Sequence, residues 1–260
     1  MKTKTSATHP ATRADTPAGS ARPTRPAKPR RIAAPQSQEV RLIGGLWKRT
    51  KLKVFDKPGL RPTPDRVRET LFNWLGQDLG GWRCIDVFAG TGALGFEAAS
   101  RGAAEVRMVE QDTALVEQLK RIQIQLQASM TQIVRGDGVA ALRQLDAGSM
   151  DIIFLDPPFE SALPKSALPK SALPKSDLPK SAAPTSSPSK AIPPNSAPFN
   201  STVFDAALLA AGRAVAGTGF VYLEAPLKWT DAQLTAAGLV LHRHLKAGAV
   251  HAHLLKRPAA

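Results

Sequence analysis

The sequence predicts an α/β protein built on a doubly wound, mostly parallel sheet of seven strands, preceded by a small basic β-ribbon and helix. Two observations support this fold class. Short apolar runs alternate with segments whose apolar residues recur at helical spacing, which is the pattern of strand–helix–strand units. The run at 150–155 (MDIIFL) is apolar almost throughout, as expected for a strand whose two faces are both covered.

The predicted elements follow one another from residue 83 onward. The strands are expected at 83–88, 105–110, 131–135, 150–155, 219–224, 239–244 and 250–255. The helices are expected at 93–101, 112–128, 139–145 and 203–216. Ligands of such sheets bind outside the carboxyl ends of the strands, so the residues that follow the strands are the candidates for a site.

Proline and positive charge gather in two segments with few large apolar residues. Residues 1–40 carry eight Lys/Arg, two acids and six prolines, and residues 161–200 carry five lysines, one aspartate and nine prolines. The first segment is predicted to be a disordered basic tail, because it cannot bury enough apolar surface to offset its ordering entropy. The second begins with SALPK three times and is predicted to be an extended, low-complexity insertion, since a proline every fifth residue excludes a helix.

The composition limits the possible functions. A formal charge of +14 indicates a polyanionic partner. The single cysteine, Cys84, excludes an internal disulfide and a multi-thiolate zinc site. His242, His244, His251 and His253 alternate along the last strands, but no nearby acid or cysteine completes a ligand set, so no metal is expected. No run approaches the roughly 18 apolar residues that span a bilayer, and no secretory signal is present, so a cytoplasmic protein is expected.

A glycine loop follows the first strand of the predicted sheet. Gly90, Gly92 and Gly95 fit the spacing G-x-G-x-x-G, and Glu110 ends the next strand 20 residues after Gly90, where a ribose hydroxyl would be bound. A dinucleotide would place its pyrophosphate on this loop. Asp86, at the mouth of the loop, would repel a pyrophosphate but suits the cationic sulfonium and ammonium of S-adenosylmethionine, so the methyl donor is favoured. Asp86 could alternatively cap the turn.

Asp137 follows the third strand and has two possible roles. Its carboxylate could accept a hydrogen bond from the amino group of an adenine, or it could cap the helix that starts at Val139. The two roles are compatible.

The tetrapeptide Asp156-Pro-Pro-Phe159 follows the fourth strand. The two prolines hold the backbone extended and remove two N–H donors, which leaves a carboxylate and a carbonyl facing outward. An exocyclic amine conjugated to a nucleobase is a poor nucleophile. The Asp156 carboxylate and the Pro157 carbonyl could hold such an amine, and Phe159 could stack on the base. A turn stiffened by proline is the alternative.

The segment between residues 41 and 68 concentrates positive charge. Arg41, Lys48, Arg49, Lys51 and Lys53 can engage phosphates, and the interleaved Leu46, Leu52 and Val54 predict a β-ribbon with one buried face. A solvated charged hairpin is the alternative. A helix is predicted at 67–75, with Arg66 and Arg68 on its exposed side and Leu71 and Leu75 in the core.

Taken together, these motifs resemble the RsmD family. The glycine loop with Asp86, then Glu110 and DPPF, is similar to amino-group methyltransferases. RLIGG at 41–45 and GLRPTPDRVRETLFNWL at 59–75 resemble RsmD, a family of bacterial enzymes that methylate a guanine N2 of small-subunit (16S) ribosomal RNA. The resemblance covers roughly residues 41–160 and 203–257, and it implies a Rossmann-like class I methyltransferase fold.

The resemblance also implies roles for individual residues. Asp86, Gly90 and Gly92 would line the methionine part of the donor, Glu110 would bind its ribose and Asp137 its adenine. Asp156, Pro157 and Phe159 would hold the guanine. The segment that closes over the donor and meets RNA would include Arg61, Thr63, Arg66 and Arg68.

The implied organisation is a tail at 1–40, an RNA-contacting extension at 41–68, a methyltransferase domain at 69–160 and 201–257, and an insertion at 161–200. The expected partner is 16S ribosomal RNA in the 30S subunit or an assembly intermediate, and the expected oligomeric state is a monomer. The C-terminal strand reads GAVHAH, which departs from the family pattern, where an aromatic residue is expected. A DNA adenine-N6 methylase, another amino-methylase and a non-catalytic RNA-binding assembly factor remain as alternatives.

Overall fold

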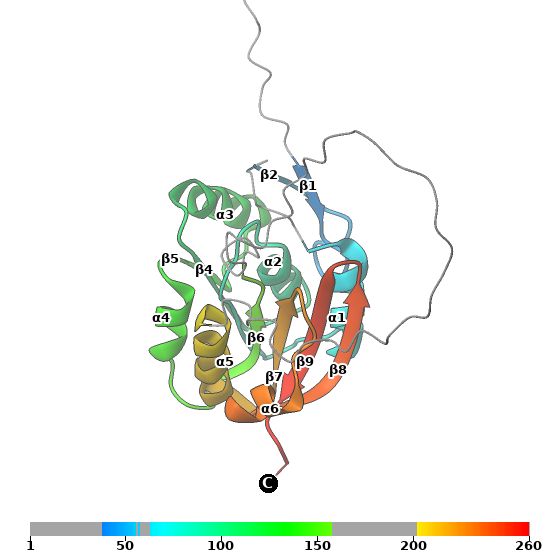
Figure 1. Cartoon of the computed structure of the whole chain (residues 1–260). Helices are drawn as coiled ribbons and strands as arrows, with labels where there is room; N and C mark the ends of the chain where they lie inside the picture. The colour runs from blue at the N-terminus through cyan, green and yellow to red at the C-terminus, as the bar shows by residue number, and fades with distance from the viewer. Residues whose placement is uncertain (1–37, 56, 58–62, 158–201, 260) are drawn as a thin grey trace, which may run out of the picture. The chain divides into compact units, whose positions relative to one another are not determined.

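The central sheet follows the predicted order of strands. The computed structural model describes residues 38–55, 57, 63–157 and 202–259, all within the compact unit Pro35–Ala260; the other unit, Met1–Ala34, lies outside the described residues. Seven strands pair in the order β5-β4-β3-β6-β7-β9-β8 (Figure 1). Their bounds are β3 Arg83–Asp86, β4 Glu105–Glu110, β5 Thr131–Arg135, β6 Met150–Leu155, β7 Val215–Ala225, β8 Val240–Ala247 and β9 Val250–Lys256.

The first five of these strands in sequence are parallel, and β9 runs antiparallel to both β7 and β8. The strand order reverses between β3 and β6, which are neighbours in space although two strands separate them in sequence. This reversal is the topological switch point, where open α/β sheets bind their ligands. The doubly wound α/β fold predicted from the sequence is therefore confirmed.

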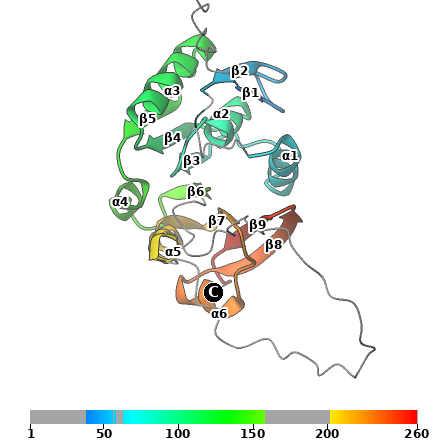
Figure 2. The same cartoon turned by 45° about the horizontal axis from the view of Figure 1, so that its top comes forward.

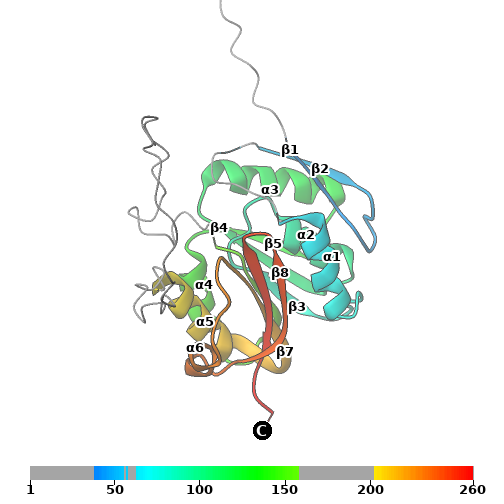
Figure 3. The ribbon, with the colours of Figure 1, turned by 45° about the vertical axis from the view of Figure 1, so that its right-hand side comes forward.

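In the part of the chain that the structure describes, three helices cover each face of the sheet (Figures 2 and 3). On one face lie α1 Asp65–Trp74, α2 Ala93–Ser100 and α3 Thr113–Leu126. On the other lie α4 Gly138–Arg143, α5 Thr202–Ala214 and α6 Asp231–Ala236. Leu115, Leu119, Ile122 and Leu126 of α3 are buried, as their spacing predicts. Helix α6 was not predicted from the sequence, although its Thr230–Gln233 capping box is a recognisable start signal.

A two-stranded hairpin precedes the sheet. It consists of β1 Gln38–Arg41 and β2 Lys51–Val54, paired antiparallel with Val40 opposite Leu52. Val40, Leu42, Leu52 and Val54 are buried in the same apolar core as α1 and α2. The predicted ribbon with one buried face is thus present, and it begins at Gln38, so the last residues of the predicted tail belong to a strand.

Leu46 does not belong to that buried face, contrary to the prediction. It is 78% exposed, because the chain turns at Gly44 and Gly45 and the alternation of the strand stops there. Cys84 is buried in β3, as predicted. Among the residues that the structure describes, no helix is long and apolar enough to cross a membrane.

Candidate functional site

Four acidic residues lie at the carboxyl ends of neighbouring strands. Asp86 ends β3, Glu110 ends β4, Asp156 follows β6, and Glu224 lies one residue before the end of β7. The register places Asp86 beside Phe154 and Leu155 beside Leu223, so Asp156 and Glu224 follow paired residues. The fold therefore gathers Asp86, Glu110 and Asp156, which the sequence singled out, and adds Glu224, which it did not.

The glycine loop between β3 and α2 is held by Glu110. The N–H of Gly90 donates to Glu110 Oε2 at 2.9 Å, and the N–H of Asp112 donates to Oε1 at 2.8 Å. Gly92 has a φ of +79°, and a Cβ there would lie 2.6 Å from Leu119 and 2.7 Å from Phe96. Glycine at this position therefore allows both the turn and the packing of α2 onto α3.

Asp86 is a buried carboxylate with one oxygen unsatisfied. Its Oδ2 accepts a hydrogen bond from the Gly95 N–H at 3.0 Å, so it caps the turn, while its Oδ1 is buried without a partner among the described residues. Burial, and then the nearby charge of Asp156, raise the pKa of Asp86 to about 7. A buried carboxylate with a free oxygen fits a cationic ligand, because the cation would supply the missing partner.

Asp137 caps α4, which confirms one of its two predicted roles. Its Oδ1 accepts a hydrogen bond from the Ala140 N–H at 2.7 Å, and its Oδ2 accepts from Gln111 Nε2 at 3.0 Å. The residue is exposed near the carboxyl end of β5. The contact with an adenine stays a prediction.

Asp156 is bonded to the segment before α1. The Thr63 hydroxyl donates to Asp156 Oδ2 at 3.0 Å. Burial of the carboxyl raises the pKa of Asp156 and the hydrogen bond from Thr63 lowers it; the net result is a rise to about 6. Pro157 is buried, and Phe159 lies outside the described residues.

Glu224 was not singled out from the sequence. It is 2% exposed, and its Oε1 accepts a hydrogen bond from the Tyr222 hydroxyl at 2.7 Å. Burial, and then the charge of Asp156, raise the pKa of Glu224 to about 8. Only the pairing of β6 with β7 brings this residue to Asp156; an acid near the end of a strand is not distinctive in sequence.

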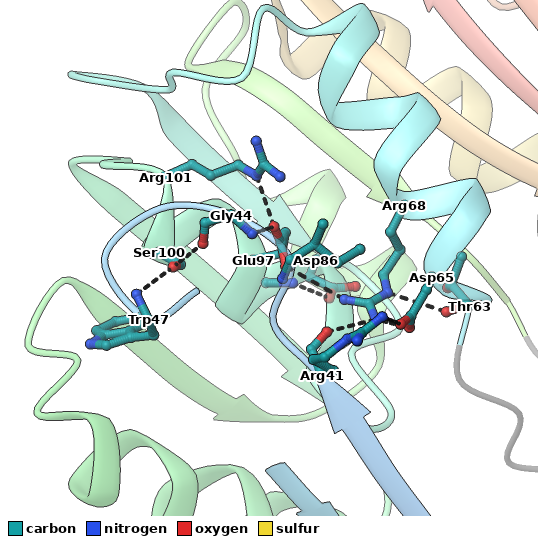
Figure 4. A network of polar contacts seen from close by, with 12 residues as sticks. Arg41, Gly44, Trp47, Thr63, Asp65, Arg68, Asp86, Glu97, Ser100 and Arg101 are labelled. Carbon is teal, nitrogen blue, oxygen red and sulfur yellow. Dashed lines mark hydrogen bonds and ion pairs between the residues drawn. The ribbon is translucent and has the colours of Figure 1, made fainter. Parts of the chain in front are cut away.

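Arg68 lies inside the protein, which corrects its predicted place on the exposed side of the helix. It is 1% exposed and ion-pairs with Asp65 at 2.6 Å and with Glu97 at 3.5 Å (Figure 4). It also donates to the carbonyls of Arg41 at 2.9 Å and Thr63 at 3.2 Å. A guanidinium buried to this extent is not accessible to RNA. Thr63 is also buried and bonds Asp156, so it is not an RNA-facing residue either.

Glu97 of α2 anchors the turn of the hairpin. Its fully buried carboxylate accepts hydrogen bonds from the N–H groups of Ile43 and Gly44 and from Arg101 Nε, each at 2.8 Å (Figure 4). A Cβ at Gly45, where φ is +72°, would lie 1.7 Å from the Ser100 carbonyl oxygen. Glycine at this position of the RLIGG motif therefore allows the turn to lie close against α2.

The remaining basic residues of the hairpin region lie at the surface. Arg41 and Lys51 are exposed and pair with Asp65 and Glu39 at 3.0 and 2.8 Å. The others that the structure describes as exposed are Lys48, Arg49, Lys53 and Arg66. Arg61 lies outside the described residues. The phosphate-binding role that the sequence predicts for these basic residues stays a prediction.

Three of the four histidines meet on β8 and β9. His244 Nε2 lies 3.0 Å from His251 Nδ1, and the His244 and His253 rings are 5.0 Å apart. Burial lowers the pKa of His253 to about 4, and its Nε2 accepts a hydrogen bond from the Trp229 N–H. No group of three or more His, Cys, Asp or Glu side chains within the described ranges could hold a metal ion.

Known proteins share both the sequence motifs and this fold. The family model described as Conserved hypothetical protein 95 matches residues 40–176. Ribosomal RNA small subunit methyltransferase D of Escherichia coli is 46% identical over 127 residues, which are 49% of this chain and 64% of the relative, just under two thirds of its length. The protein of the same name from Haemophilus influenzae is 44% identical over 134 residues, covering 50% of this chain and 69% of the relative.

A solved structure described as "Putative methyltransferase yhhF from Escherichia coli" superposes with a TM-score of 0.60 at 29% identity, covering 86% of this chain and all of that one. The family model spans more than half of the present chain, and the match with the Haemophilus influenzae relative exceeds two thirds of that protein. The chain therefore belongs to the family described as Conserved hypothetical protein 95, which is the RsmD family that its motifs resemble.

Proposed function

We propose that this protein transfers a methyl group from S-adenosylmethionine to the exocyclic N2 of a guanine in small-subunit (16S) ribosomal RNA. The observation that carries the proposal is the juxtaposition, at the switch point of the sheet, of Asp156-Pro157 and a buried Asp86 oxygen without a partner. The names of the relatives support the ribosomal substrate.

The donor would be held by the ends of β3, β4 and β5. Asp86 would face its positive charge, the backbone of Gly90 and Gly92 would pass beside its methionine part, and Glu110 and Asp137 would accept hydrogen bonds from its ribose and adenine. When bound, the donor supplies an electrophilic methyl group on a sulfonium. One Glu110 oxygen accepts from Gly90 of the glycine loop and the other from Asp112 before α3, so the same carboxylate would both shape the loop and contact the donor.

The base would be held by the end of β6. The Asp156 carboxylate and the Pro157 carbonyl would accept the two N2 hydrogens, which directs the nitrogen lone pair at the methyl carbon, and Phe159 would stack on the ring. Catalysis would come from this positioning, together with transfer of the released proton to Asp156.

The RNA would be held by the exposed basic side chains of the hairpin region. The proposed partner is 16S ribosomal RNA within a 30S subunit or an assembly intermediate, bound by a monomer in the cytoplasm. The anchor at Glu97 fixes the hairpin to α2, the helix that follows the glycine loop. Phosphate contacts made by the hairpin would therefore be held at a constant position relative to the donor.

Binding of the donor is expected to release a proton near pH 6. The pKa of Asp86 is raised to about 7, and a cationic ligand would favour its ionised form, so donor affinity should rise from pH 5 to pH 7 and level off above. Asp86→Asn keeps an oxygen for the Gly95 N–H but loses the charge. This variant should bind the donor about tenfold or more weakly, a loss of about 1.4 kcal/mol.

The measurement is calorimetric titration with the donor at pH 6, in two buffers of different ionisation enthalpy. Proton release should be seen in the wild type and lost in Asp86→Asn. Asp146→Asn, an exposed aspartate before β6, is the matched control and should behave as wild type. Equal proton release in Asp86→Asn and the wild type would contradict the proposed contact between Asp86 and the donor.

Reversing one charge on the hairpin is expected to weaken RNA binding in a salt-dependent way. Arg49→Glu should lower the affinity for 16S RNA and reduce the slope of log K against log salt by about 1, the value for one lost phosphate contact. The control is Arg143→Glu, an equal change of charge on the exposed last turn of α4. Filter binding from 50 to 300 mM salt would measure the slope for each variant. Equal slopes for Arg49→Glu and Arg143→Glu would show that Arg49 does not contact the RNA.

The function itself is tested with labelled donor and three substrates: 30S particles, free 16S RNA and DNA. Label in the ribosomal substrate, mapped to the N2 of one guanine, would support the proposal. Label only in DNA would indicate an adenine-N6 or related amino-methylase. RNA binding without any transfer, and without heat on addition of the donor, would indicate an assembly factor that uses the methylase fold.

A further inference from the structure

A small pocket lies between the end of β2 and helix α3, two elements that lie side by side (Figures 1 and 3). Its volume is about 280 Å³, near the lower end of the range of about 300–1,000 Å³ that ligand pockets span. The lining includes Lys53 and Phe55 from the hairpin side and Gln118 and Arg121 from the helix. Nothing in the proposed reaction uses this pocket.

The Phe55 ring is held in place beside α3 and is 39% exposed. The backbone N–H of Phe55 donates to Gln118 Oε1 at 2.5 Å, and two residues later Lys57 ion-pairs with Asp112, the N-cap of α3, at 2.5 Å. The segment that carries the ring is therefore joined to the helix at two points. Exposure alone would not indicate a ligand, because single apolar side chains are common at protein surfaces.

Gln118 adds a buried amide with an unused donor to the same pocket. The residue is 4% exposed, and its Nε2 has no hydrogen-bond partner among the described residues. Because Oε1 accepts from the Phe55 N–H, the orientation of the amide is fixed and Nε2 is the group that is left over. Buried polar groups nearly always have a partner, so this NH2 group is expected to donate to an acceptor that a ligand brings.

The charge of the pocket favours an anionic ligand. Lys53 and Arg121 are exposed, and no acidic side chain within the described ranges lines the pocket. Glu39 lies opposite Lys53 in the hairpin but ion-pairs with Lys51. The pair between Arg121 and Glu117 is 3.7 Å long and largely exposed, and such pairs are weak. Both cations therefore remain available to phosphate oxygens.

We propose that this pocket binds one unpaired nucleotide of the RNA substrate, distinct from the guanine that is methylated. Its base stacks on Phe55 and accepts a hydrogen bond from Gln118 Nε2, while Lys53 and Arg121 bind the phosphates beside it. Stacking on aromatic rings, hydrogen bonds to base edges and cations along the backbone are the means by which proteins bind single-stranded RNA. The inference rests on the proposed function, which supplies the RNA.

The position of the pocket separates affinity from chemistry. Helix α3 begins after the turn that follows β4, whose last residue, Glu110, would contact the donor. A nucleotide bound beside α3 therefore lies on the donor side of the sheet, whereas Asp156 follows β6 on the other side of β3. The pocket should strengthen RNA binding without changing the rate of methyl transfer from the bound complex.

The first test compares the loss of an aromatic ring with the loss of a charge. Phe55→Ala should weaken binding of 16S RNA about 5–150-fold, the effect of losing one stacked base, with an unchanged dependence on salt. Arg121→Ala should instead lower the slope of log K against log salt by about 1. The matched controls are Ile124→Ala and Lys120→Ala, exposed side chains of α3 outside the pocket, which should bind RNA as the wild type does.

Two further variants separate stacking from hydrogen bonding. Phe55→Trp keeps an aromatic face, so it should retain the wild-type affinity, and its added fluorescence should be quenched when RNA binds. Gln118→Glu keeps an oxygen for the Phe55 N–H but loses the NH2 donor, so it should bind RNA about tenfold more weakly. Circular dichroism of each variant would verify that the fold is retained. Wild-type affinity in a folded Gln118→Glu variant would contradict the hydrogen bond to the base.

The source of the nucleotide is identified with three probes: 16S RNA, a fully paired RNA duplex and adenosine monophosphate. Phe55→Ala should lose affinity for 16S RNA but not for the duplex, whose bases are already stacked on one another. Unchanged affinity for 16S RNA, or a loss confined to the mononucleotide, would overturn the inference.

Methyl transfer distinguishes this inference from the function on which it rests. With 16S RNA as substrate, Phe55→Ala should raise the KM for RNA and leave kcat within about twofold of the wild type. A lower kcat with an unchanged KM would overturn the inference. If the wild type transfers no methyl group to 16S RNA, while Phe55→Ala still weakens RNA binding, the proposed function is wrong and the pocket remains an RNA site.

Discussion

Replacing Asp156 with asparagine is expected to lower methyl transfer by about 10²–10⁴-fold, the range for a positioned general base, while donor affinity changes less than about threefold. Asparagine has the same shape and keeps one oxygen for the Thr63 hydroxyl. It cannot accept the N2 proton, and it brings an amide that would oppose the amine of the base. The donor would be held by β3, β4 and β5, so its site should remain.

The sign of the change in donor affinity can also be predicted. The charge of Asp156 raises the pKa of Asp86, so removing that charge makes Asp86 ionise more readily. Donor binding at pH 6.5 should therefore be equal to or slightly tighter than in the wild type. Calorimetric titration and single-turnover kinetics would measure the two effects separately.

A matched control lies on the same strand. Asp151 lies near the start of β6, at the amino ends of the parallel strands, and ion-pairs with Arg83 at 3.2 Å. The variant Asp151→Asn should keep the wild-type kcat. A wild-type rate of methyl transfer in Asp156→Asn would show that Asp156 takes no part in the reaction.

Replacing Glu97 with alanine is expected to cost about 3–5 kcal/mol of unfolding free energy, the range for breaking a buried ion pair by removing one partner. Glu97 is fully buried and serves two guanidinium groups, Arg68 and Arg101, which are themselves 1% and 6% exposed. The variant would also leave the N–H groups of Ile43 and Gly44 without an acceptor.

Urea unfolding followed by circular dichroism would measure this loss, with Glu117→Ala as the control. Glu117 is also one turn before an arginine, but its pair with Arg121 is 3.7 Å long and 61–70% exposed. Such pairs contribute about 0–1 kcal/mol. A loss below about 1 kcal/mol in Glu97→Ala would show that the network in Figure 4 is not needed for stability.

Much of the sheet could be predicted from the sequence because its strands are short apolar runs ended by glycine or charge. The bounds of β4, β5 and β6 agree residue for residue with the predictions. The candidate acids were also found, because Asp86, Glu110 and Asp156 each end or directly follow such a run, where a parallel sheet places its ligand site.

The residues that were misplaced depend on partners distant in sequence. Arg68 was assigned to the surface because arginine is rarely buried, and the carboxylate that allows its burial lies 29 residues later. Glu224 lies beside Asp156 only because β6 pairs with β7 in the folded chain. Leu46 continues the apolar alternation in sequence, but the close approach of Gly45 to α2 interrupts the strand before that position.

The hairpin shares its apolar core with the helices of the larger domain, and this has a consequence for folding. Val40, Leu42, Leu52 and Val54 have no core of their own; they are buried against the same cluster as Phe72 and Phe96. A two-stranded ribbon by itself is only marginally stable in water. The hairpin is therefore not a transplantable module: a shortened chain that begins after it would expose an apolar surface, and the intact chain should melt with both parts in one cooperative transition.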